Sequence, residues 1–415
     1  MIKLYLLLID SLIPSLVGMS IILISGMSHS MNEYLYGYII LSVSIISISH
    51  IKGFYDNYFL IHFSDKIKIS FITSIIGIFC QIIFYLNYQI ELNIFILFSF
   101  LIIPPSILLT KYVIKVKNKP INEVKISIIG NFYKFNKYEN ETLINKGFEL
   151  HYYDSIDEFL NKNQKEQQSD NIVVINLDKS TPNINQIVSL MNTVSLNEFM
   201  KNYLRKIYIE DFEVISNINT YNKSDYLLKR SVDYISIIIL FPFLILGSAF
   251  LIYMKFLKGL NGSFLYTQKR YGINQKTFSL LKLRTMHTDS DNMGNTVKND
   301  NRVYSFAKNL RKLRIDELPQ IINILLGDMH LVGPRAEWTK LSDEYSKNIE
   351  NYNLRNIVRP GITGWAQIIY QYGFNTDDAE QKLMYELYYI KNWSIWLEIE
   401  ICVKTIMVIL DKKGF

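Results

Sequence analysis

Long apolar runs fill the N-terminal part of the chain and alternate with short polar loops. Four of these runs are each close to the roughly 20 residues that span a bilayer, and they lie at roughly 4–27, 34–50, 70–87 and 92–110. The first run begins almost at the N-terminus, as a signal peptide does, but it lacks a clear small-residue cleavage site and three more runs follow it. The pattern therefore predicts four transmembrane helices within residues 1–118.

Charges in the connecting loops indicate how these helices are oriented. The loops "SHSMNEY" and "NYQIELN" contain no Lys or Arg, whereas the loop between the second and third runs contains Lys52, Lys66 and Lys68. The basic segment "KYVIKVKNK" follows the fourth run. Because loops rich in Lys and Arg remain in the cytoplasm, both ends of this unit are predicted to be cytoplasmic.

Residues 119–222 change to short apolar runs separated by polar segments. "EVKISIIGN", "GFELHYYD" and "DNIVVINLD" are typical of buried strands, and their alternation with helix-compatible segments predicts a Rossmann-like α/β module with a parallel sheet. Gly130 follows the first strand, but the G-x-G-x-x-G pattern does not. A structural or regulatory role is therefore favoured over nucleotide binding.

A fifth apolar run, at 229–259, has no charge between Asp233 and Lys255 and is long enough to span a bilayer. Both of its flanks are basic, which conflicts with placing one end outside. Pro242 also lies within the run, where it removes a backbone hydrogen bond and kinks the helix. We therefore predict a re-entrant helix, about 231–257, that bends at Pro242 and returns to the same leaflet. An ordinary fifth span with a proline kink is the alternative.

The last apolar segment, "YELYYIKNWSIWLEIEICVKTIMVIL", mixes Trp and Tyr with charges and aliphatic residues. This composition suits an interfacial membrane helix and an amphipathic core helix equally well.

Composition excludes several classes of function. The net charge of +6 over 415 residues is too diffuse for a nucleic-acid-binding protein, and basic residues beside apolar runs favour an anionic lipid surface instead. Two cysteines, Cys80 and Cys402, support neither a disulfide framework nor a cysteine-based zinc site.

Two adjacent acids, Asp316 and Glu317, stand out in "RKLRIDELPQIINILLGDMHLVGPR". The simple interpretation is a helix start, where acids favour the helix dipole and proline is tolerated. The alternative is a catalytic dyad, because the irregular backbone of a helix start lets both side chains converge. Aspartate can attack phosphoryl groups, and carboxylates bind Mg²⁺ together with substrate phosphates.

Basic residues accompany this acid pair along the chain. Lys308, Arg311 and Arg314 recur at a spacing of three, which predicts three cations on one helical face. Arg359 lies in the turn of "VRPGITGWAQ". Because arginine binds phosphate through a bidentate fork, these residues indicate a phosphorylated anionic substrate.

A hairpin is predicted upstream of the acid pair. "YTQKRYGINQKTFSLLKLRTMHTDS" is typical of two short strands joined by a Gly-Asn turn, and its second strand ends at Lys282 and Arg284.

The order of these motifs resembles the bacterial sugar transferase family, the monotopic polyprenyl-phosphate phosphoglycosyl transferases. The motifs are "KRSVDY", "TQKRYG", "LKLRTM", "LRKLRIDELPQIINILLGDMHLVGPR", "VRPGITGWAQ" and "YYIKNWSIWLEI". The resemblance covers about residues 225–415 and places the catalytic domain at 223–415. With its four-helix unit and its α/β module, the chain is similar to the large members that act on galactose or glucose phosphate. The expected fold is thus a membrane protein with α and α/β parts.

The resemblance implies transfer of a sugar-1-phosphate from a nucleotide diphosphate sugar, expected to be a UDP-sugar, to undecaprenyl phosphate. This is the first membrane step of exopolysaccharide, capsule, O-antigen or glycan assembly. It implies a multi-pass protein of the bacterial inner membrane, in contact with membrane lipids, with its catalytic domain on the cytoplasmic face and a possible homodimer. The alternative is a non-catalytic membrane scaffold or regulator of polysaccharide assembly.

The resemblance also implies roles for individual residues. Asp316 is expected to be a nucleophile that forms a covalent phospho-sugar intermediate, with Glu317 as its partner and Mg²⁺ held by both. Pro242 is expected at the break of the re-entrant helix. The expected phosphate-binding residues are Lys282, Arg284, Arg311, Arg314, Arg335 and Arg359.

Departures from the family pattern surround the dyad without touching it. Arg314 and Ile315 stand where Ser-Leu is common, His330 replaces a common Ser, and Ala336 replaces a common Pro. We expect these residues to affect the choice of sugar or the fit of the lipid.

Overall fold

The computed structural model divides into two compact units, Met1–Phe199 and Met200–Phe415, and each is described by itself. The residues that the structure describes are 8–10, 12–14, 16–20, 31–51, 62–88, 102–104, 107, 124–163, 172–176, 193–209, 218, 220–258, 263–287, 301–370 and 375–410.

Two long helices lie in the N-terminal unit, α2 (Met31–Ile51) and α3 (Phe63–Tyr88), and they pack against each other. They coincide with the predicted apolar runs at 34–50 and 70–87. The run at 4–27 is described only in short pieces, and most of the run at 92–110 lies outside the described residues. The four-helix unit therefore stays a prediction.

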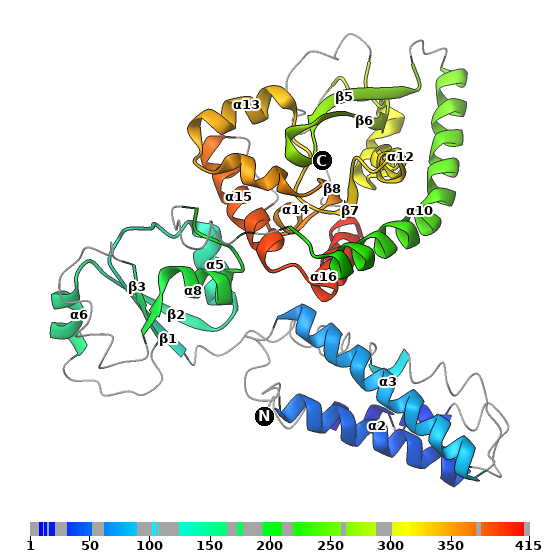
Figure 1. The fold of residues 1–415 in the computed structure, drawn as a ribbon, viewed down its shortest axis with the longest axis vertical. Coiled ribbons are helices and arrows are strands. Elements are labelled where there is room, and N and C mark those ends of the chain that lie inside the picture. Colours follow the sequence, from blue (N-terminus) through cyan, green and yellow to red (C-terminus); the bar gives the residue numbers. More distant parts are fainter. Residues whose placement is uncertain are drawn as a thin grey trace. The chain divides into compact units, whose positions relative to one another are not determined.

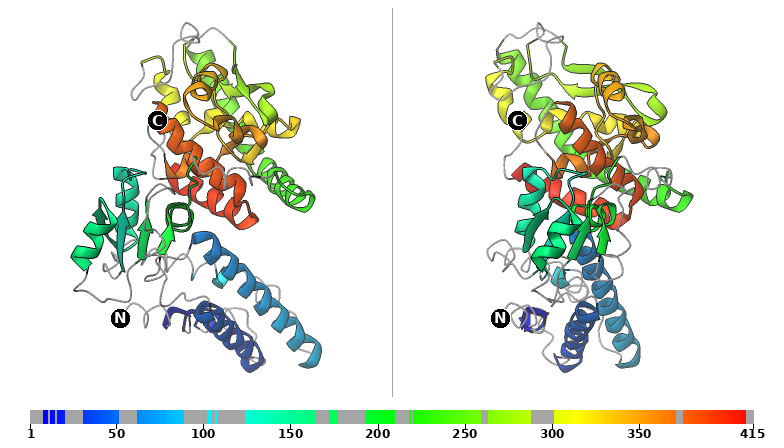
Figure 2. Two further views of the ribbon diagram at one scale, coloured as in Figure 1. Left: turned by 60° about the vertical axis from the view of Figure 1, so that its left-hand side comes forward. Right: turned by 90° about the vertical axis from the view of Figure 1, so that its left-hand side faces the viewer.

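A parallel sheet forms the α/β part of the same unit, and its strand order is β2-β1-β3-β4. Its strands are β1 (Val124–Ile129), β2 (Phe148–Tyr153), β3 (Ile172–Ile175) and β4 (Thr193–Ser195). The accompanying helices are α5 (Lys137–Asn145), α6 (Ile156–Asn163) and α8 (Leu196–Phe199). Figures 1 and 2 show α5 and α6 beside the strands. The predicted parallel sheet is confirmed.

The carboxyl ends of the adjacent strands β1 and β3 lie at one edge of the sheet. Doubly wound folds bind their ligands at this edge. Here the Asn176 amide donates to the carbonyls of Gly130 (3.1 Å) and Tyr133 (2.8 Å), and its oxygen accepts from the Tyr133 amide (2.8 Å). The loop after β1 is thus held by internal hydrogen bonds. This arrangement favours the structural role over nucleotide binding.

The C-terminal unit mixes helices with two small two-stranded sheets. Its helices are the π-helix η2 (Met200–Leu204), α10 (Lys223–Leu257), α11 (Lys308–Lys312), α12 (Gln320–Leu326), α13 (Thr339–Asn348), α14 (Trp365–Ile369), α15 (Thr376–Lys391) and α16 (Ile395–Leu410). Its short 3₁₀ turns are η3 (Ile273–Gln275), η5 (Ser305–Ala307), η6 (Ile315–Glu317) and η7 (Tyr352–Ile357). Its strands are β5 (Leu265–Tyr271), β6 (Thr277–Leu283), β7 (His330–Val332) and β8 (Gly361–Thr363).

The predicted hairpin is confirmed, because β5 and β6 pair antiparallel around the turn at η3. Strands β7 and β8 form a parallel pair. This pair brings the segment after the acid pair next to the "RPG" turn that precedes β8.

Helix α10 follows one edge of the C-terminal unit and changes direction partway along (Figure 1). It remains one helix from Lys223 to Leu257, with Pro242 in its interior, and proline is a common cause of a bend within a helix. By length and apolar composition alone, α10 is the one helix in the described part of the chain that is suited to crossing a bilayer.

One stripe of α10 packs on the rest of the unit, and its residues recur every three or four positions as one helical face requires. The stripe comprises Ile237, Leu240, Leu244, Gly247, Leu251 and Lys255. Ile237, Leu240 and Leu244 pack with strand β6 and helix α12, and Leu251 packs in a cluster with Leu283 and Leu310. Both halves of the helix, before and after Pro242, therefore rest on the same domain.

Two local predictions are wrong. Arg314 has a left-handed backbone (φ 57°), which ends the helical path after α11, so Lys308, Arg311 and Arg314 do not share one helical face. The C-terminal segment forms two helices rather than one, and Tyr388 and Tyr389 of α15 are buried. For these two tyrosines the core alternative holds and the interfacial one does not.

Residues 200–209 belong to the C-terminal unit through specific contacts. The Ile207 amide donates to the carbonyl of Met384 (3.0 Å). The Arg205 guanidinium pairs with Glu400 (2.8 Å) and lies 4.3 Å from the ring of Trp365. The indole of Trp365 donates in turn to the Arg205 carbonyl (3.0 Å). A segment just outside the expected catalytic domain, 223–415, thus completes its core.

We expect Arg205→Ala to destabilise the C-terminal unit, because Glu400 would lose a buried partner and Trp365 a stacked cation. The loss should be about 3 kcal/mol, or about 6–12 °C in Tm, measured by thermal unfolding of the purified chain in detergent. The control is Lys137→Ala, which removes an ion pair to Glu141 whose lysine side chain is 90% exposed. Equal Tm values for the two variants would contradict this account of residues 200–209.

Candidate active site

The adjacent acids lie in a tight turn between two helices. Arg314 adopts its left-handed conformation, and Ile315–Glu317 then form the 3₁₀ turn η6. Pro319 precedes the first residue of α12, where its missing N–H costs nothing. The acid pair therefore sits at an irregular helix start. The helix-start interpretation is therefore correct. The irregular backbone there also allows both carboxylates to converge, as the dyad interpretation requires.

Glu317 is a buried carboxylate that is held by two cations. Its Oε1 accepts from Lys282 Nζ (2.9 Å) and lies 3.4 Å from Arg314 Nη1. Burial alone raises the pKa of Glu317, but the charges of Lys282, Arg314 and Arg335 outweigh burial and hold this pKa well below its usual range. Glu317 is therefore a permanently charged, fixed member of the pair.

Asp316 differs from its neighbour. It is 6% exposed, and its Oδ1 is buried with no hydrogen-bond partner among the described residues. Burial, and then the charge of Glu317, raise the pKa of Asp316 above its usual value, although Lys282, Arg311 and Arg314 oppose this rise. One carboxylate is thus tied down and the other carries an unpartnered oxygen, as expected for a group that is meant to bond to something else.

Beside the turn lies a shallow depression that is open to solvent. Its lining is contributed by both small sheets and the start of α12, and consists of Arg270, Leu280, Lys282, Glu317, Gln320, Met329, Arg335, Ala336, Gly361 and Ile362. Three of these residues are cations that face a single lining acid. Such a surface suits a ligand with more than one negative charge.

The expected phosphate-binding residues separate into two groups. Lys282 and Arg335 line the depression, and Arg311 and Arg314 act electrostatically on Asp316. Arg284 and Arg359 lie elsewhere. Arg284, just after β6, donates to Ser263 Oγ (3.2 Å), and Arg359 donates to Tyr226 Oη (2.8 Å) at the start of α10.

Sequence reasoning missed Arg270 and Gln320. Arg270 donates to the Ala336 carbonyl (2.9 Å) and to Gln268 Oε1 (2.6 Å), and its Nε is buried without a partner among the described residues. Arg270 could have been found from the hairpin register. It pairs with Phe278, which lies four residues before Lys282 in the next strand. Because side chains alternate with a period of two, Arg270 and Lys282 lie on the same face of the hairpin. Gln320 is buried, and its amide makes no hydrogen bond to another described residue.

The donor set is compatible with Mg²⁺. No cluster of three or more His, Cys, Asp or Glu side chains occurs in the described ranges, so an all-protein metal cage is not formed there. Mg²⁺ instead commonly takes one or two carboxylates and completes its shell with substrate phosphates and water. The unpartnered Oδ1 of Asp316 fits that pattern, with Glu317 beside it.

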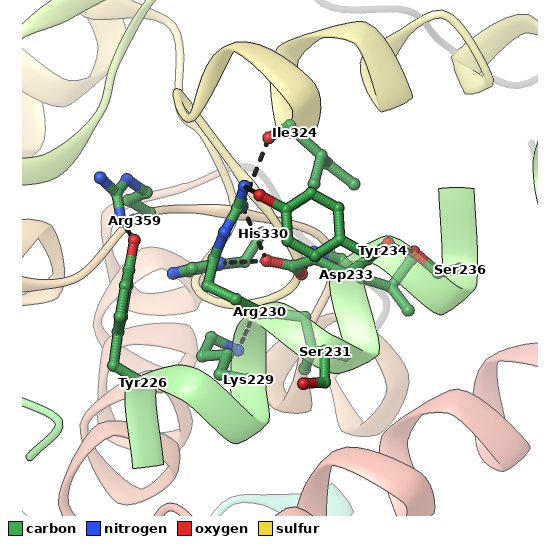
Figure 3. A network of polar contacts seen from close by, with 12 residues as sticks. Tyr226, Lys229, Arg230, Ser231, Asp233, Tyr234, Ser236, Ile324, His330 and Arg359 are labelled. Atoms are coloured by element: carbon green, nitrogen blue, oxygen red, sulfur yellow. Dashed lines mark hydrogen bonds and ion pairs between the residues drawn. The ribbon is translucent and has the colours of Figure 1, made fainter. Parts of the chain in front are cut away.

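A buried polar network fixes the start of α10 near this site (Figure 3). Asp233 accepts from His330 Nδ1 (2.7 Å), from the Leu331 amide (2.8 Å) and from Arg230 (3.0 Å). Arg230 also donates to the carbonyl of Ile324 on α12 (3.3 Å). Burial, partly offset by Asp233, lowers the pKa of His330 to about 4, so its ring is neutral at neutral pH. The network joins α10, β7 and the helix that follows the acid pair.

A family model described as bacterial sugar transferase matches residues 224–412. The chain is 40% identical, over 45% of its length, to 44% of a UDP-N-acetylgalactosamine-undecaprenyl-phosphate N-acetylgalactosaminephosphotransferase from Aeromonas hydrophila. It is 39% identical, over 37% of its length, to 32% of a UDP-glucose:undecaprenyl-phosphate glucose-1-phosphate transferase from Xanthomonas campestris. An uncharacterized sugar transferase, EpsL of Bacillus subtilis, is 40% identical over 36% of this chain, and the match covers 71% of EpsL. The chain spans less than half the length of the first two relatives.

We expect Asp316→Asn to raise the Tm of the protein at neutral pH. The raised pKa of Asp316 means that the folded state binds this proton more tightly than the unfolded chain does, so ionisation costs stability as pH rises above the ordinary Asp pKa. Asparagine removes that cost. The gain should be largest near pH 8 and should vanish below about pH 4, in thermal unfolding of the full chain.

The matched control for this variant is Glu350→Gln, which neutralises an exposed carboxylate of the same unit. It should leave Tm within about 1 °C of wild type at every pH. A Tm for Asp316→Asn below that of wild type at pH 8 would contradict the strained-carboxylate description.

Proposed function

We propose, from the premise that this chain belongs to the bacterial sugar transferase family, that it transfers a sugar-1-phosphate from a UDP-sugar to undecaprenyl phosphate. The observation that carries the proposal is the acid pair itself. A buried aspartate with an unpartnered oxygen stands next to a glutamate fixed by two cations, at the edge of a basic depression.

The basic depression suits the diphosphate of the donor. Lys282, Arg270 and Arg335 supply cations from three different segments, so a ligand with two adjacent phosphates can meet several of them at once. Mg²⁺, held through Asp316 and Glu317, would neutralise further phosphate charge when bound. The Gln320 amide, which is free of other described partners, is available to orient the donor.

The proposed reaction has two balanced displacements at one phosphorus atom. In the first, a carboxylate oxygen of Asp316 forms a bond to the phosphorus that carries the sugar, and the bond from that phosphorus to the UMP oxygen breaks. In the second, a phosphate oxygen of undecaprenyl phosphate attacks the same phosphorus, and the aspartyl oxygen leaves. Asp316 is regenerated, and the lipid carries the sugar on a diphosphate.

Glu317 is suited to the partner role because it remains charged. A carboxylate that stays ionised is suited to holding Mg²⁺, and Lys282 and Arg314 fix its position. The raised pKa of Asp316 makes its oxygen a more basic, and therefore better, nucleophile than an ordinary aspartate.

The membrane association of the chain rests on α10. Its outer face is apolar and exposed over both halves, with Ile238 74% exposed before Pro242 and Phe256 83% exposed near the end. Its inner stripe meanwhile packs on the catalytic unit over its whole length. A helix that crossed the bilayer could not keep one soluble domain against both of its ends, so this packing supports the re-entrant form bent at Pro242.

Further parts of the proposal come from the apolar runs, the loop charges and the family resemblance. They are a location in the bacterial inner membrane with the catalytic unit on the cytoplasmic face, four membrane helices within residues 1–118, and a homodimer. The rival function is a non-catalytic scaffold or regulator of polysaccharide assembly, which would not require the acid pair.

We expect Asp316→Asn to abolish transfer, because an amide cannot take part in the covalent step. The assay incubates the purified chain, Mg²⁺ and undecaprenyl phosphate with a panel of nucleotide sugars, and it measures the UMP released. Activity should fall by at least about 10³-fold, while the protein remains folded and in the membrane fraction. The scaffold alternative predicts an inactive wild type in this assay and polysaccharide assembly that survives the substitution.

We expect the two flanks of α10 to lie on one side of the membrane. Single cysteines at Lys223 and Asn301, both exposed, are introduced after Cys80 and Cys402 have been replaced by serine. In intact cells a membrane-impermeant maleimide should label neither site, and permeabilisation should expose both. Labelling of the Asn301 site alone in intact cells would show that α10 crosses the bilayer and that the catalytic unit lies outside. Labelling of the Lys223 site alone would show that α10 crosses the bilayer with the catalytic unit inside.

A further inference from the structure

Gly247 lies on the inner stripe of α10, opposite the residue that precedes the acid pair. A methyl group at Gly247 would lie 2.5 Å from Cγ2 of Ile315 and 4.0 Å from its Cβ, and no other described residue comes within 4 Å of it. Real side chains do not approach so closely. Ile315 therefore packs directly on the backbone of α10, and only glycine leaves room for it.

A glycine in this place needs an explanation. Glycine is the least favourable residue in a helix interior apart from proline. Gly247 lies five residues beyond Pro242, in the part of α10 whose outer face is apolar and exposed. Close approach of another element is the ordinary reason for such a glycine, and Ile315 is that element here.

Ile315 transmits this contact to the acid pair. It is the first residue of η6, and Asp316 follows it directly. Its β-branched side chain has little rotamer freedom, and it is further confined by the cluster around Leu251 and Leu310. A displacement of Ile315 would therefore move the backbone of the turn and, with it, the carboxylate of Asp316.

We infer that Gly247 is a positioning residue, whose contact with Ile315 sets where the nucleophile Asp316 lies relative to the bent helix. The inference rests on the proposed function. It assigns to the re-entrant helix a second task besides anchoring, since the same helix that enters the membrane also locates the reacting oxygen. Misplacement by about 1 Å can cost about 100-fold in rate.

The test is a double-mutant cycle on the full-length chain in membranes or nanodiscs, with UMP release as the readout. Gly247→Ala should lower kcat by about 10- to 100-fold and leave KM for the UDP-sugar and the amount of protein in the membrane fraction unchanged. Helix propensity alone predicts a more stable α10 and no loss of kcat, because alanine is the better helix former.

Rescue distinguishes positioning from general damage. Ile315→Ala removes Cγ2, the atom that a methyl group at Gly247 would meet at 2.5 Å, and leaves only Cβ at 4.0 Å. The kcat of Gly247→Ala/Ile315→Ala should therefore be higher than the product of the two single effects on kcat predicts. Ile315→Val keeps Cγ2, so Gly247→Ala/Ile315→Val should remain impaired. Ala249→Val, on the exposed face two residues away, should behave as wild type.

Three outcomes overturn the inference. They are full activity of Gly247→Ala, single effects that simply multiply in the double variant, and equal rescue by Ile315→Ala and Ile315→Val. If the wild type releases no UMP from any nucleotide sugar, the proposed function fails, and this inference fails with it. An active wild type together with any of the three outcomes removes the inference alone.

Discussion

One buried ammonium group, that of Lys229, organises the C-terminal unit. It is wholly inaccessible to solvent, and its three donors reach Glu398 Oε1 (2.6 Å), the Val332 carbonyl (2.7 Å) and the Tyr389 hydroxyl (2.7 Å). An ammonium without partners would cost several kcal/mol when buried, so α10, β7, α15 and α16 must all be in place together. Asp233, one turn further along α10, is a buried carboxylate that likewise needs several partners. It accepts hydrogen bonds from His330, Leu331 and Arg230. These bonds hold the start of α10 against β7, the strand that follows the acid pair and α12 in the chain.

The distribution of nearby charges also shifts the pKa values of Asp316 and Glu317 in opposite directions. Adjacent carboxylates repel each other's charge and therefore titrate in separate steps, and here the unequal distribution of cations decides which of the two stays charged. Lys282 and Arg314 contact Glu317, whereas Asp316 feels them only at longer range and is left with an unpartnered oxygen. Environments that drive two pKa values apart give two like residues different chemical roles. The stability lost at Asp316 is the kind of local cost that a folded scaffold tolerates where chemistry requires it.

Much of this arrangement could be predicted from local patterns. The alternation of apolar runs identified the parallel sheet and the β5–β6 hairpin, and composition identified α10 as a long apolar helix with Pro242 inside it. Arg311 and Arg314, predicted from their closeness in sequence to the acid pair, act electrostatically on Asp316, and their phosphate-binding role stays a prediction. What escaped prediction depends on long-range placement. Spacing alone put Arg314 on a helical face, because a left-handed residue in the middle of a basic run leaves no apolar signature. Arg270 escaped because its partners are set by hairpin register, and Arg359 was grouped with the site although the fold carries it to Tyr226.

In the proposed function a single helix, α10, faces lipid on one side and the catalytic unit on the other, and so joins the site to the membrane. Its outer face must be apolar to enter lipid, and its inner stripe must match a domain that carries charges only a few residues away. Gly247 meets the second requirement at one point of the stripe, since without a side chain it lets the Ile315 side chain pack directly on the helix backbone. Ile315 takes that opening and Asp316 follows it in the chain. A lipid substrate that remains in the leaflet can meet a water-soluble donor only where such a helix leaves the membrane. Under the proposed function, the contact between Ile315 and Gly247 would tie the reacting carboxylate to the helix that enters the membrane.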